Sequence, residues 1–424
     1  MNLVGRGKGG LLRTAVTVLV VVGAVGLRYA MFGRESDDYR YFLQPWYQHI
    51  KWHGHFGALR DPSFADYNVP YLYLLALLSY LPVPAMAGIK AISLCSDLLL
   101  AFFAARIAAL RSPANPWRPL LAAVLVLFLP TVAVNSGWWG QADSIYTSFA
   151  LGGVYYALRR RSWTACALFG LALAFKLQAV FILPLLLVLV PTRRLSVRSL
   201  LAIPGVYLLM DVPALLVGAD PWKLLTIYQR QTGSYQALTL NAPSVYQFVG
   251  VRGRQAEELV RSLGILLAGV VMLLLAAAVL FSRTSGGRRR LRAEEPELTD
   301  TRVVLMATVA VVAVPFLLPS MHDRYFYPAD VLTVVAFCYL PRRLWFAPLL
   351  MQFASLGSYL EYLERHAWHH APHEQRWFAA AVAVLLVSLL AVTVLEFRRR
   401  PPVWADRPDR HRPAWAAPVG AGRR

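Results

Sequence analysis

A hydrophobic run near the start of the chain is followed at once by an acidic, aromatic stretch. Residues 11–30 read LLRTAVTVLVVVGAVGLRYA, and residues 35–47 read ESDDYRYFLQPWY. An α-helix needs about 20 predominantly apolar residues to cross a bilayer, so the first run predicts a transmembrane helix. Apolar runs recur along the rest of the chain, and we therefore expect an uncleaved first helix rather than a secretory signal peptide.

The composition extends this expectation to the whole chain. The 424 residues are 57% hydrophobic and 16% charged, with a mean hydropathy of +0.47, whereas soluble domains carry about 25% charged residues. The apolar runs, such as Leu121–Val134 and Leu385–Leu395, show no polar and apolar alternation, which excludes a transmembrane β-barrel. We expect an all-α polytopic membrane protein with a single membrane domain over residues 1–396.

Basic residues gather between the apolar runs, and their positions predict the orientation. The net charge is +20, but the pattern is typical of the positive-inside bias and not of nucleic-acid binding. If every basic loop is cytoplasmic, both termini are cytoplasmic too, and residues 397–424 form a basic, disordered cytoplasmic tail. Arginine far exceeds lysine, as in GC-rich bacteria, so we expect a plasma membrane. The basic segments are Arg111–Arg118, Arg159–Arg161, Arg193–Arg198, Arg283–Arg292, Arg342–Arg343 and Arg398–Arg424.

This orientation predicts roughly twelve transmembrane helices. The chemically capable side chains then fall mainly on the extracytoplasmic face, in the loops 31–69 and 219–261 and in shorter turns. No glycine-rich phosphate loop follows a strand, so a nucleotide-using cytoplasmic site is not expected. The predicted spans are 11–30, 86–110, 119–136, 142–158, 163–175, 178–190, 198–218, 262–282, 302–318, 326–340, 343–360 and 375–396.

The first extracytoplasmic loop is expected to contain an amphipathic helix. Apolar and aromatic residues recur there at three- and four-residue steps, which predicts a helix lying on the membrane surface. These residues are Phe42, Trp46, His49, Ile50, His53 and Phe56. The following run, Leu72–Leu81, is too short to span a bilayer and predicts a re-entrant or interfacial helix; a thirteenth span would invert the later basic loops.

Two short spans, 163–175 and 178–190, lie between the basic segments Arg159–Arg161 and Arg193–Arg194. Because both basic segments should be cytoplasmic, we predict a helical hairpin; the alternative is one long bent helix. The hairpin tip carries Lys176 and Gln178. A cation at this depth requires a wet or anionic environment, so Lys176 either binds an anion or pairs with a buried acid.

Two further turns concentrate polar residues on the same face. One, Trp138–Asp143, contains Gln141 and places Asp143 at the start of a span, where a carboxylate can also simply cap the helix. The other, Pro319–Pro328, contains His322, Asp323, Arg324 and Tyr325. Arginine binds phosphate through two parallel hydrogen bonds, so this turn suits a phosphate head group.

Four stretches resemble the GT-C class of integral-membrane glycosyltransferases, particularly bacterial proteins related to GPI mannosyltransferases. The resemblance implies a polyprenyl-phosphate sugar donor, an acidic base in the first loop, and a role in the cell envelope. It favours mannose, leaving arabinose and glucose open, and implies no divalent metal. Because Asp37 and Asp38 are adjacent, it leaves open which one is the base. The stretches are Asp38-Tyr39, Trp139–Asp143, Phe175–Gln178 and His322–Phe326.

The chemistry of such a transfer assigns roles to the candidate residues. Asp38, or Asp37, would accept the proton of the acceptor hydroxyl. Lys176, Arg324 and His322 would stabilise the departing lipid phosphate, and a single displacement would invert the anomeric centre. The acceptor would be a glycan, a glycolipid or a protein. Candidate sugar or acceptor contacts are Gln141, Asp143, Gln178, Asn241, Tyr246 and Tyr325, although Asn241 and Tyr246 also fit an ordinary structured turn.

A transporter or flippase for a lipid-linked sugar or related anion is the alternative function. The intramembrane residues Lys90, Asp97 and Asp211 would then form a coupling route, unless Lys90 and Asp97 pair with each other or with neighbours. No pair of broken helices recurs in two matching halves, as transporters often show. A purely structural scaffold would leave the first loop and Lys176 without a role, and the His-rich loop 361–374 has no assignment.

Overall fold

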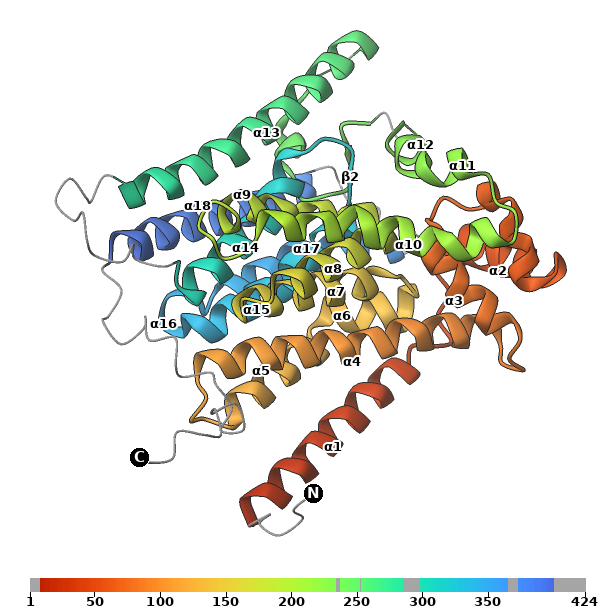
Figure 1. Ribbon diagram of the computed structural model, residues 1–424, viewed down its shortest axis with the longest axis horizontal. Helices are drawn as coiled ribbons and strands as arrows, with labels where there is room; N and C mark the ends of the chain where they lie inside the picture. Colours follow the sequence, from red (N-terminus) through yellow and green to blue (C-terminus); the bar gives the residue numbers. More distant parts are fainter. Residues whose placement is uncertain (1–7, 234–236, 252, 285–297, 365–372, 400–424) are drawn as a thin grey trace, which may run out of the picture.

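The protein is a bundle of long helices that run side by side (Figure 1). Its structure, a computed structural model, describes residues 8–233, 237–251, 253–284, 298–364 and 373–399. The α-helices are α1 (Lys8–Tyr29), α2 (Gln44–Trp52), α3 (Val69–Ser79), α4 (Ala85–Arg111), α5 (Trp117–Phe128), α6 (Pro130–Val134), α7 (Asp143–Leu158), α8 (Ser162–Phe175), α9 (Leu186–Leu189), α10 (Ala202–Leu216), α11 (Pro221–Leu225), α12 (Ile227–Gly233), α13 (Arg254–Thr284), α14 (Asp300–Leu317), α15 (Tyr327–Tyr339), α16 (Pro341–Leu344), α17 (Ala347–Leu363) and α18 (His373–Arg398).

Short irregular helices and one strand pair connect these elements. Strand β1 (Thr239–Leu240) pairs in parallel with β2 (Met321–His322), with Leu240 opposite His322. This pairing ties the loop 219–261 to the turn between α14 and α15. Two π-helical turns cover Tyr39–Leu43 and Asn135–Trp139, and 3-10 helices cover His55–Arg60, Pro62–Phe64, Leu177–Leu185, Val197–Leu201, Val245–Phe248 and Asp323–Phe326.

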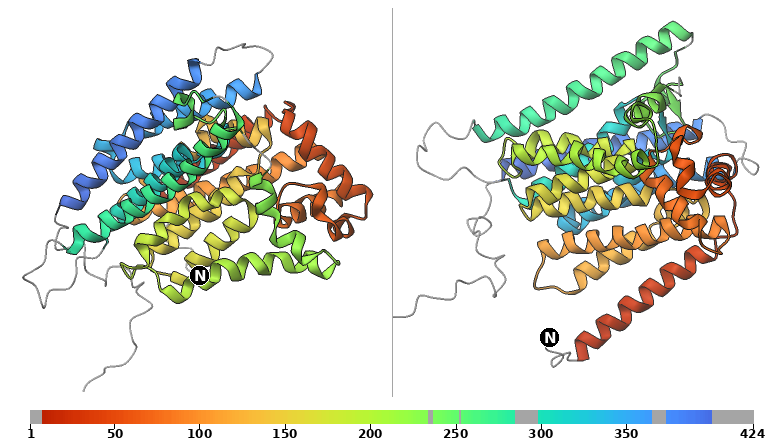
Figure 2. Two further views of the ribbon diagram at one scale, coloured as in Figure 1. Left: turned by 90° about the horizontal axis from the view of Figure 1, so that it is seen from above. Right: turned by 45° about the vertical axis from the view of Figure 1, so that its right-hand side comes forward.

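The bundle has a buried centre and apolar outer edges, which confirms an all-α polytopic membrane protein. Helix α14 is almost entirely buried, whereas α1 and α13 lie on opposite outer edges (Figures 1 and 2). The outer helices expose large apolar side chains such as Leu19 and Leu266. Apolar side chains that face outward from a helix of spanning length are suited to contact lipid.

Helix length distinguishes two groups among the predicted spans. Six described helices are long and apolar enough to cross a membrane, or seven if the pair Trp117–Phe128 and Pro130–Trp139, bent by 53°, is one span. The other predicted spans are also helical but shorter; α15, for example, has 13 residues, about 20 Å at 1.5 Å per residue. The predicted count of twelve is therefore not established, nor is the side of the membrane on which each terminus lies.

The predicted hairpin is present, and the alternative of one long bent helix is wrong. Helix α8 leads to Lys176, whose extended backbone ends it, and the chain then returns through the 3-10 helix Leu177–Leu185 and α9. At the base of the hairpin, the Ser196 backbone N–H donates to Ser162 Oγ over 3.2 Å. The return arm is largely 3-10 rather than α-helical; Pro184 within it has no N–H to donate.

The first loop contains the predicted helix as α2, but its position corrects the expected surface placement. Trp46 and Ile50 are buried in a cluster with α3 residues, so much of the apolar face packs inside the protein. The helix also ends at Trp52, before the last two predicted face residues, and Gly54 follows with a positive φ of 83°. The next run forms α3, whose 11 residues span only about 16 Å, as predicted for a helix too short to cross.

The residues proposed for a transport route are mostly held in fixed contacts. Fully buried Asp97 pairs with Arg28, at 2.7 Å between Oδ2 and Nε, and also accepts from Ser136. Lys90 donates to the carbonyl oxygens of residues 31, 32 and 34, just after α1. Lys90 and Asp97 thus pair with neighbours and not with each other. Asp211 is buried on α10, and neither carboxylate oxygen has a hydrogen-bond partner among the described residues.

Candidate active site

A cavity of about 200 Å³ lies where the first loop, the hairpin tip and the turn before α15 meet. Seven of the residues proposed from the sequence line it, although they come from positions between 38 and 325 in the chain. The lining residues are Asp38, Phe42, Leu43, Trp46, Asp66, Tyr67, Gln141, Lys176, Gln178, Gln231, His322, Arg324, Tyr325 and Tyr362.

Asp38 is the buried acid of this cavity; Asp66, which also lines it, is exposed, and Asp37 does not line it. The Asp38 side chain accepts hydrogen bonds from Trp139 Nε1 at 3.0 Å, from Gln141 Nε2, and from the Tyr362 hydroxyl at 2.7 Å. Only 8% of Asp38 is exposed, whereas Asp37 is exposed to solvent. The geometry therefore distinguishes two neighbours that the sequence could not separate.

Hydrogen bonds hold the backbone next to Asp38 against the π-helical turn Asn135–Trp139. Ser36 Oγ donates to the Trp139 carbonyl over 3.0 Å and accepts from the Tyr39 N–H over 3.1 Å. The π-helical turn Asn135–Trp139 ends at Gly140, whose φ of 74° suits glycine. These contacts hold the first loop against the start of α7.

Arg324 links the two acids of the site. Its Nη1 lies 3.0 Å from Asp38 Oδ2, and its Nε lies 3.9 Å from Asp143 Oδ2. The guanidinium also lies 5.5 Å from the centre of the Trp139 ring, a distance suited to a cation–π contact. Arg324 is therefore fixed at the cavity wall by charge and by an aromatic face.

Lys176 lines the cavity and pairs with a buried acid, as the structural alternative expected, whereas anion binding stays a prediction. Its Nζ lies 2.5 Å from Asp143 Oδ1. It also lies 5.1 Å and 5.9 Å from the ring centres of Tyr67 and Tyr146. Asp143 is fully buried, accepts from Asn135 Nδ2 at 2.9 Å, and lies behind Lys176 instead of lining the cavity.

His322 is held beside the cations by β2 and contacts Tyr325, with 5.1 Å between the ring centres. Burial lowers the pKa of His322 to about 3, and the charges of Arg324 and Lys176 act in the same direction. The imidazole is therefore neutral near pH 7. A neutral imidazole can still donate one hydrogen bond.

Comparison with known proteins identifies the group to which the chain belongs. The model of glycosyltransferase family 87 matches residues 64–315, more than half of the chain. The chain belongs to glycosyltransferase family 87. No curated protein matches it.

A solved structure supports the same fold for this family 87 chain. The crystal structure of ArnT from Cupriavidus metallidurans bound to undecaprenyl phosphate matches with a TM-score of 0.52 and 13% sequence identity. The match covers 90% of this chain and 78% of that one. The fold is thus of the GT-C type, and the chain is a membrane glycosyltransferase.

Asn241 and Tyr246, two proposed sugar or acceptor contacts of the family 87 chain, lie outside the cavity lining. Asn241 has a positive φ of 63° and forms a backbone bridge with His322. The Tyr246 hydroxyl donates to the Leu317 carbonyl at 2.9 Å. Asn241 thus holds the loop 219–261 against β2, and Tyr246 holds it against the end of α14, as in the structured-turn alternative.

Some lining residues were not expected from the sequence. Gln231 on α12 is one of them; like the predicted Gln178, it has a buried amide oxygen with no hydrogen-bond partner among the described residues. Tyr362 comes from α17, beyond the segment matched by the family model. Phe42 and Trp46 also line the cavity, and both belong to the apolar face predicted for the helix of the first loop.

The neutral state of His322 predicts an effect on stability at low pH. The pKa of a histidine in an unfolded chain is about 6.5, so the unfolded state binds more protons than the folded state between about pH 6.5 and pH 3. The free energy of unfolding therefore falls as the pH drops through this window. We expect wild type to lose about 1–2 kcal/mol more than His322→Gln between pH 7 and pH 4.5.

Thermal unfolding of both proteins at the two pH values measures this difference. An equal loss of stability in wild type and in His322→Gln would mean that His322 is not held neutral in the fold.

Proposed function

We propose that the chain is an inverting glycosyltransferase that moves a sugar from a polyprenyl-phosphate donor to an acceptor hydroxyl on the extracytoplasmic face. The observation that carries this proposal is the convergence of a buried carboxylate, Asp38, and two cations, Lys176 and Arg324, on one cavity. The resemblance to GPI mannosyltransferases favours mannose as the sugar. The lipid in the ArnT structure supports a donor of the polyprenyl-phosphate class.

In the proposed reaction, the acceptor oxygen forms a bond with the anomeric carbon while the bond from that carbon to the phosphate oxygen breaks. The acceptor proton passes to Asp38 as the general base. The electron pair of the broken bond leaves with the lipid phosphate, whose charge Arg324 and Lys176 stabilise. One displacement inverts the anomeric configuration, and polyprenyl phosphate is the second product.

Other residues that line the cavity are suited to a sugar. Gln178 and Gln231 supply amide oxygens without partners among the described residues, and sugar hydroxyls are donors that can satisfy them. Aromatic faces at Trp46 and Tyr67 also line the cavity. These features support recognition of a neutral, hydroxyl-rich ligand beside the phosphate.

The transporter alternative is disfavoured by the pairing of its residues. Asp97 is bound to Arg28 and Ser136, and Lys90 to three backbone carbonyls. Of the described groups proposed for a coupling route, Asp211 alone lacks hydrogen bonds to its carboxylate. A single acid does not form a route between the two faces of a membrane.

The direct test uses purified protein and a panel of polyprenyl-phosphate sugars carrying mannose, glucose or arabinose, with a glycolipid acceptor. Consumption of one donor, with inversion in the product, is the expected result. Protein reconstituted in vesicles with only one of its faces accessible then shows on which side of the membrane transfer takes place. Movement of the intact donor across the vesicle, without cleavage, would contradict the proposal.

Tyr362 is expected to keep Asp38 correctly placed. Its hydroxyl donates to Asp38 Oδ1, and its ring stacks on Trp139 at 4.9 Å between centres. A hydrogen bond to a charged group is worth about 1.5–3 kcal/mol, so Tyr362→Phe should lower kcat about tenfold or more with little change in KM.

Tyr359 provides the matched control for Tyr362. It comes from the same helix and also contacts Trp139, at 5.1 Å between ring centres, but its buried hydroxyl has no hydrogen-bond partner among the described residues. Tyr359→Phe should therefore keep wild-type kcat. Equal losses in the two variants would indicate a packing effect and remove the role of the Tyr362 hydroxyl.

A further inference from the structure

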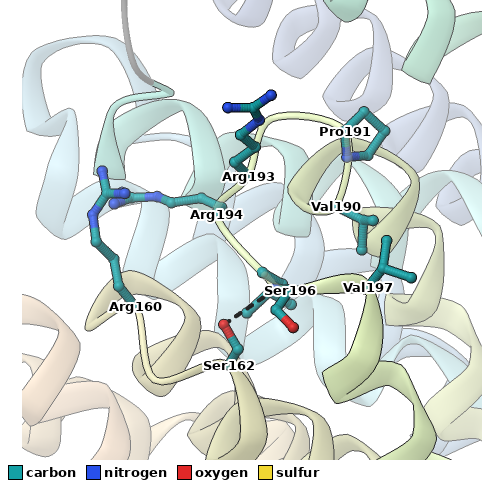
Figure 3. A pocket seen from close by; sticks show the side chains of 9 residues that line it. Arg160, Ser162, Val190, Pro191, Arg193, Arg194, Ser196 and Val197 are labelled. Carbon is teal, nitrogen blue, oxygen red and sulfur yellow. Dashed lines mark hydrogen bonds between the residues drawn. The ribbon is translucent and has the colours of Figure 1, made fainter.

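A second concavity, the arginine groove, lies at the base of the hairpin, at the opposite end from Lys176. It has a volume of about 480 Å³ and lies between the loop before α8 and the loop after α9 (Figure 3). The lining residues are Arg160, Ser162, Val190, Pro191, Arg193, Arg194, Leu195, Ser196 and Val197. Nothing in the proposed transfer uses any of them.

The two loops that form the groove adopt an unusual backbone at their arginines. Arg160 and Arg193 have positive φ angles of 56° and 55°. Residues other than glycine rarely adopt this backbone conformation, which costs about 1–3 kcal/mol. The strain occurs on both sides of one groove, where each strained residue is basic.

Arginine side chains gather in the groove, and one of them is buried. Arg194 is only 6% exposed and pairs through Nη2 with Asp300, yet its buried Nε has no hydrogen-bond partner among the described residues. Figure 3 shows the Arg160 side chain reaching toward that of Arg194, and Arg193 next to Arg194 on the same loop. Three arginines thus line one groove, and Asp300 pairs with the buried one, Arg194.

An apolar surface leads away from the arginine groove along one candidate span. Val197, in the groove, and Leu201, one turn later, are 67% and 69% exposed. The same helix, Val197–Leu216, is long and apolar enough to cross a membrane, and Leu208 is exposed further along it. The groove is therefore at the end of a span, where lipid head groups lie.

We infer that the arginine groove binds the phosphate of an anionic lipid head group. Guanidinium groups bind phosphate oxygens through paired, charge-assisted hydrogen bonds. The apolar path from Val197 to Leu208 accommodates an acyl chain, which a soluble phosphate does not have. The site is separate from the cavity at Asp38 and is independent of the proposed transfer.

Native mass spectrometry of the purified full-length chain tests this assignment with added phosphatidylglycerol or phosphatidylcholine. The groove variant is Arg160→Gln/Arg193→Gln, because both side chains are exposed and the buried Arg194 remains. The control is Arg342→Gln/Arg398→Gln, which removes the same charge from exposed positions outside the groove. We expect phosphatidylglycerol to bind about tenfold more weakly to the groove variant and within about twofold of wild type to the control.

Three results would overturn the inference. Unchanged phosphatidylglycerol binding in the groove variant would exclude the site, and equal losses in both variants would indicate attraction to net charge alone. Inorganic phosphate binding as tightly as the lipid to delipidated protein would assign the groove to a soluble anion. Thermal unfolding close to that of wild type shows that each variant is folded.

Discussion

Asp38→Asn is expected to reduce sugar transfer by about a hundredfold or more while the protein stays folded and binds the donor. The amide cannot accept the acceptor's proton at neutral pH. Its oxygen can keep the place of Oδ2, which faces Trp139, Gln141 and Arg324. Its NH₂ group can then donate to the Tyr362 hydroxyl, whose oxygen is also an acceptor. The substitution therefore removes the base with little change in packing.

Asp37→Asn is the matched control, since Asp37 is adjacent in sequence but exposed. It should turn over like wild type in steady-state assays with a short-chain polyprenyl-phosphate sugar. Activity in Asp38→Asn together with its loss in Asp37→Asn would transfer the role to Asp37. Full activity in both variants would end the proposed mechanism.

Arg324→Gln is expected to lower kcat/KM by about 30- to 1000-fold, because it removes a charge-assisted contact worth about 2–4 kcal/mol to the leaving phosphate. A group that stabilises charge developing in the transition state lowers turnover as well as apparent affinity. Asp38 keeps its contacts with Trp139, Gln141 and Tyr362 in this variant. Kinetics measured alongside thermal unfolding separate chemistry from stability.

Lys176 needs a different design from Arg324. A single Lys176→Gln substitution would leave buried Asp143 without its closest cation, and an unpaired buried charge costs about 3–5 kcal/mol. The double variant Lys176→Gln/Asp143→Asn removes both charges and avoids that penalty. Wild-type turnover in Arg324→Gln, or a loss explained by unfolding alone, would mean that the phosphate site is wrong.

The sequence predicted the elements that have a local signal. Long apolar runs indicated the helices, and the arginines flanking residues 163–190 indicated the hairpin, because charge resists crossing the bilayer. The cavity residues Asp38, Lys176 and Arg324 were found because polar groups beside apolar spans are conspicuous. The number of spans could not be predicted in the same way, because the length of a short helix such as α15 does not show whether it crosses the membrane.

Other features depend on contacts between distant parts of the chain. Tyr362 meets Asp38 across 324 positions, and its own helix carries no pattern that predicts this contact. Gln231 lies on a short helix in a loop of ordinary composition. The inward position of Asp143 behind Lys176 follows from the folded hairpin, and the sequence alone allowed a simple helix cap. These residues required the tertiary structure.

The ion pair between Arg324 and Asp38 has a consequence for the end of the catalytic cycle. The proposed donor is a phosphodiester with one negative charge, whereas polyprenyl phosphate as released product is a monoester with about −1.5 to −2 at pH 7. In the proposed reaction, the proton taken by Asp38 also removes the carboxylate charge that faces Arg324. We therefore expect the cavity to hold the product more strongly than the donor, so that product release limits turnover and a pre-steady-state burst precedes the slower steady rate.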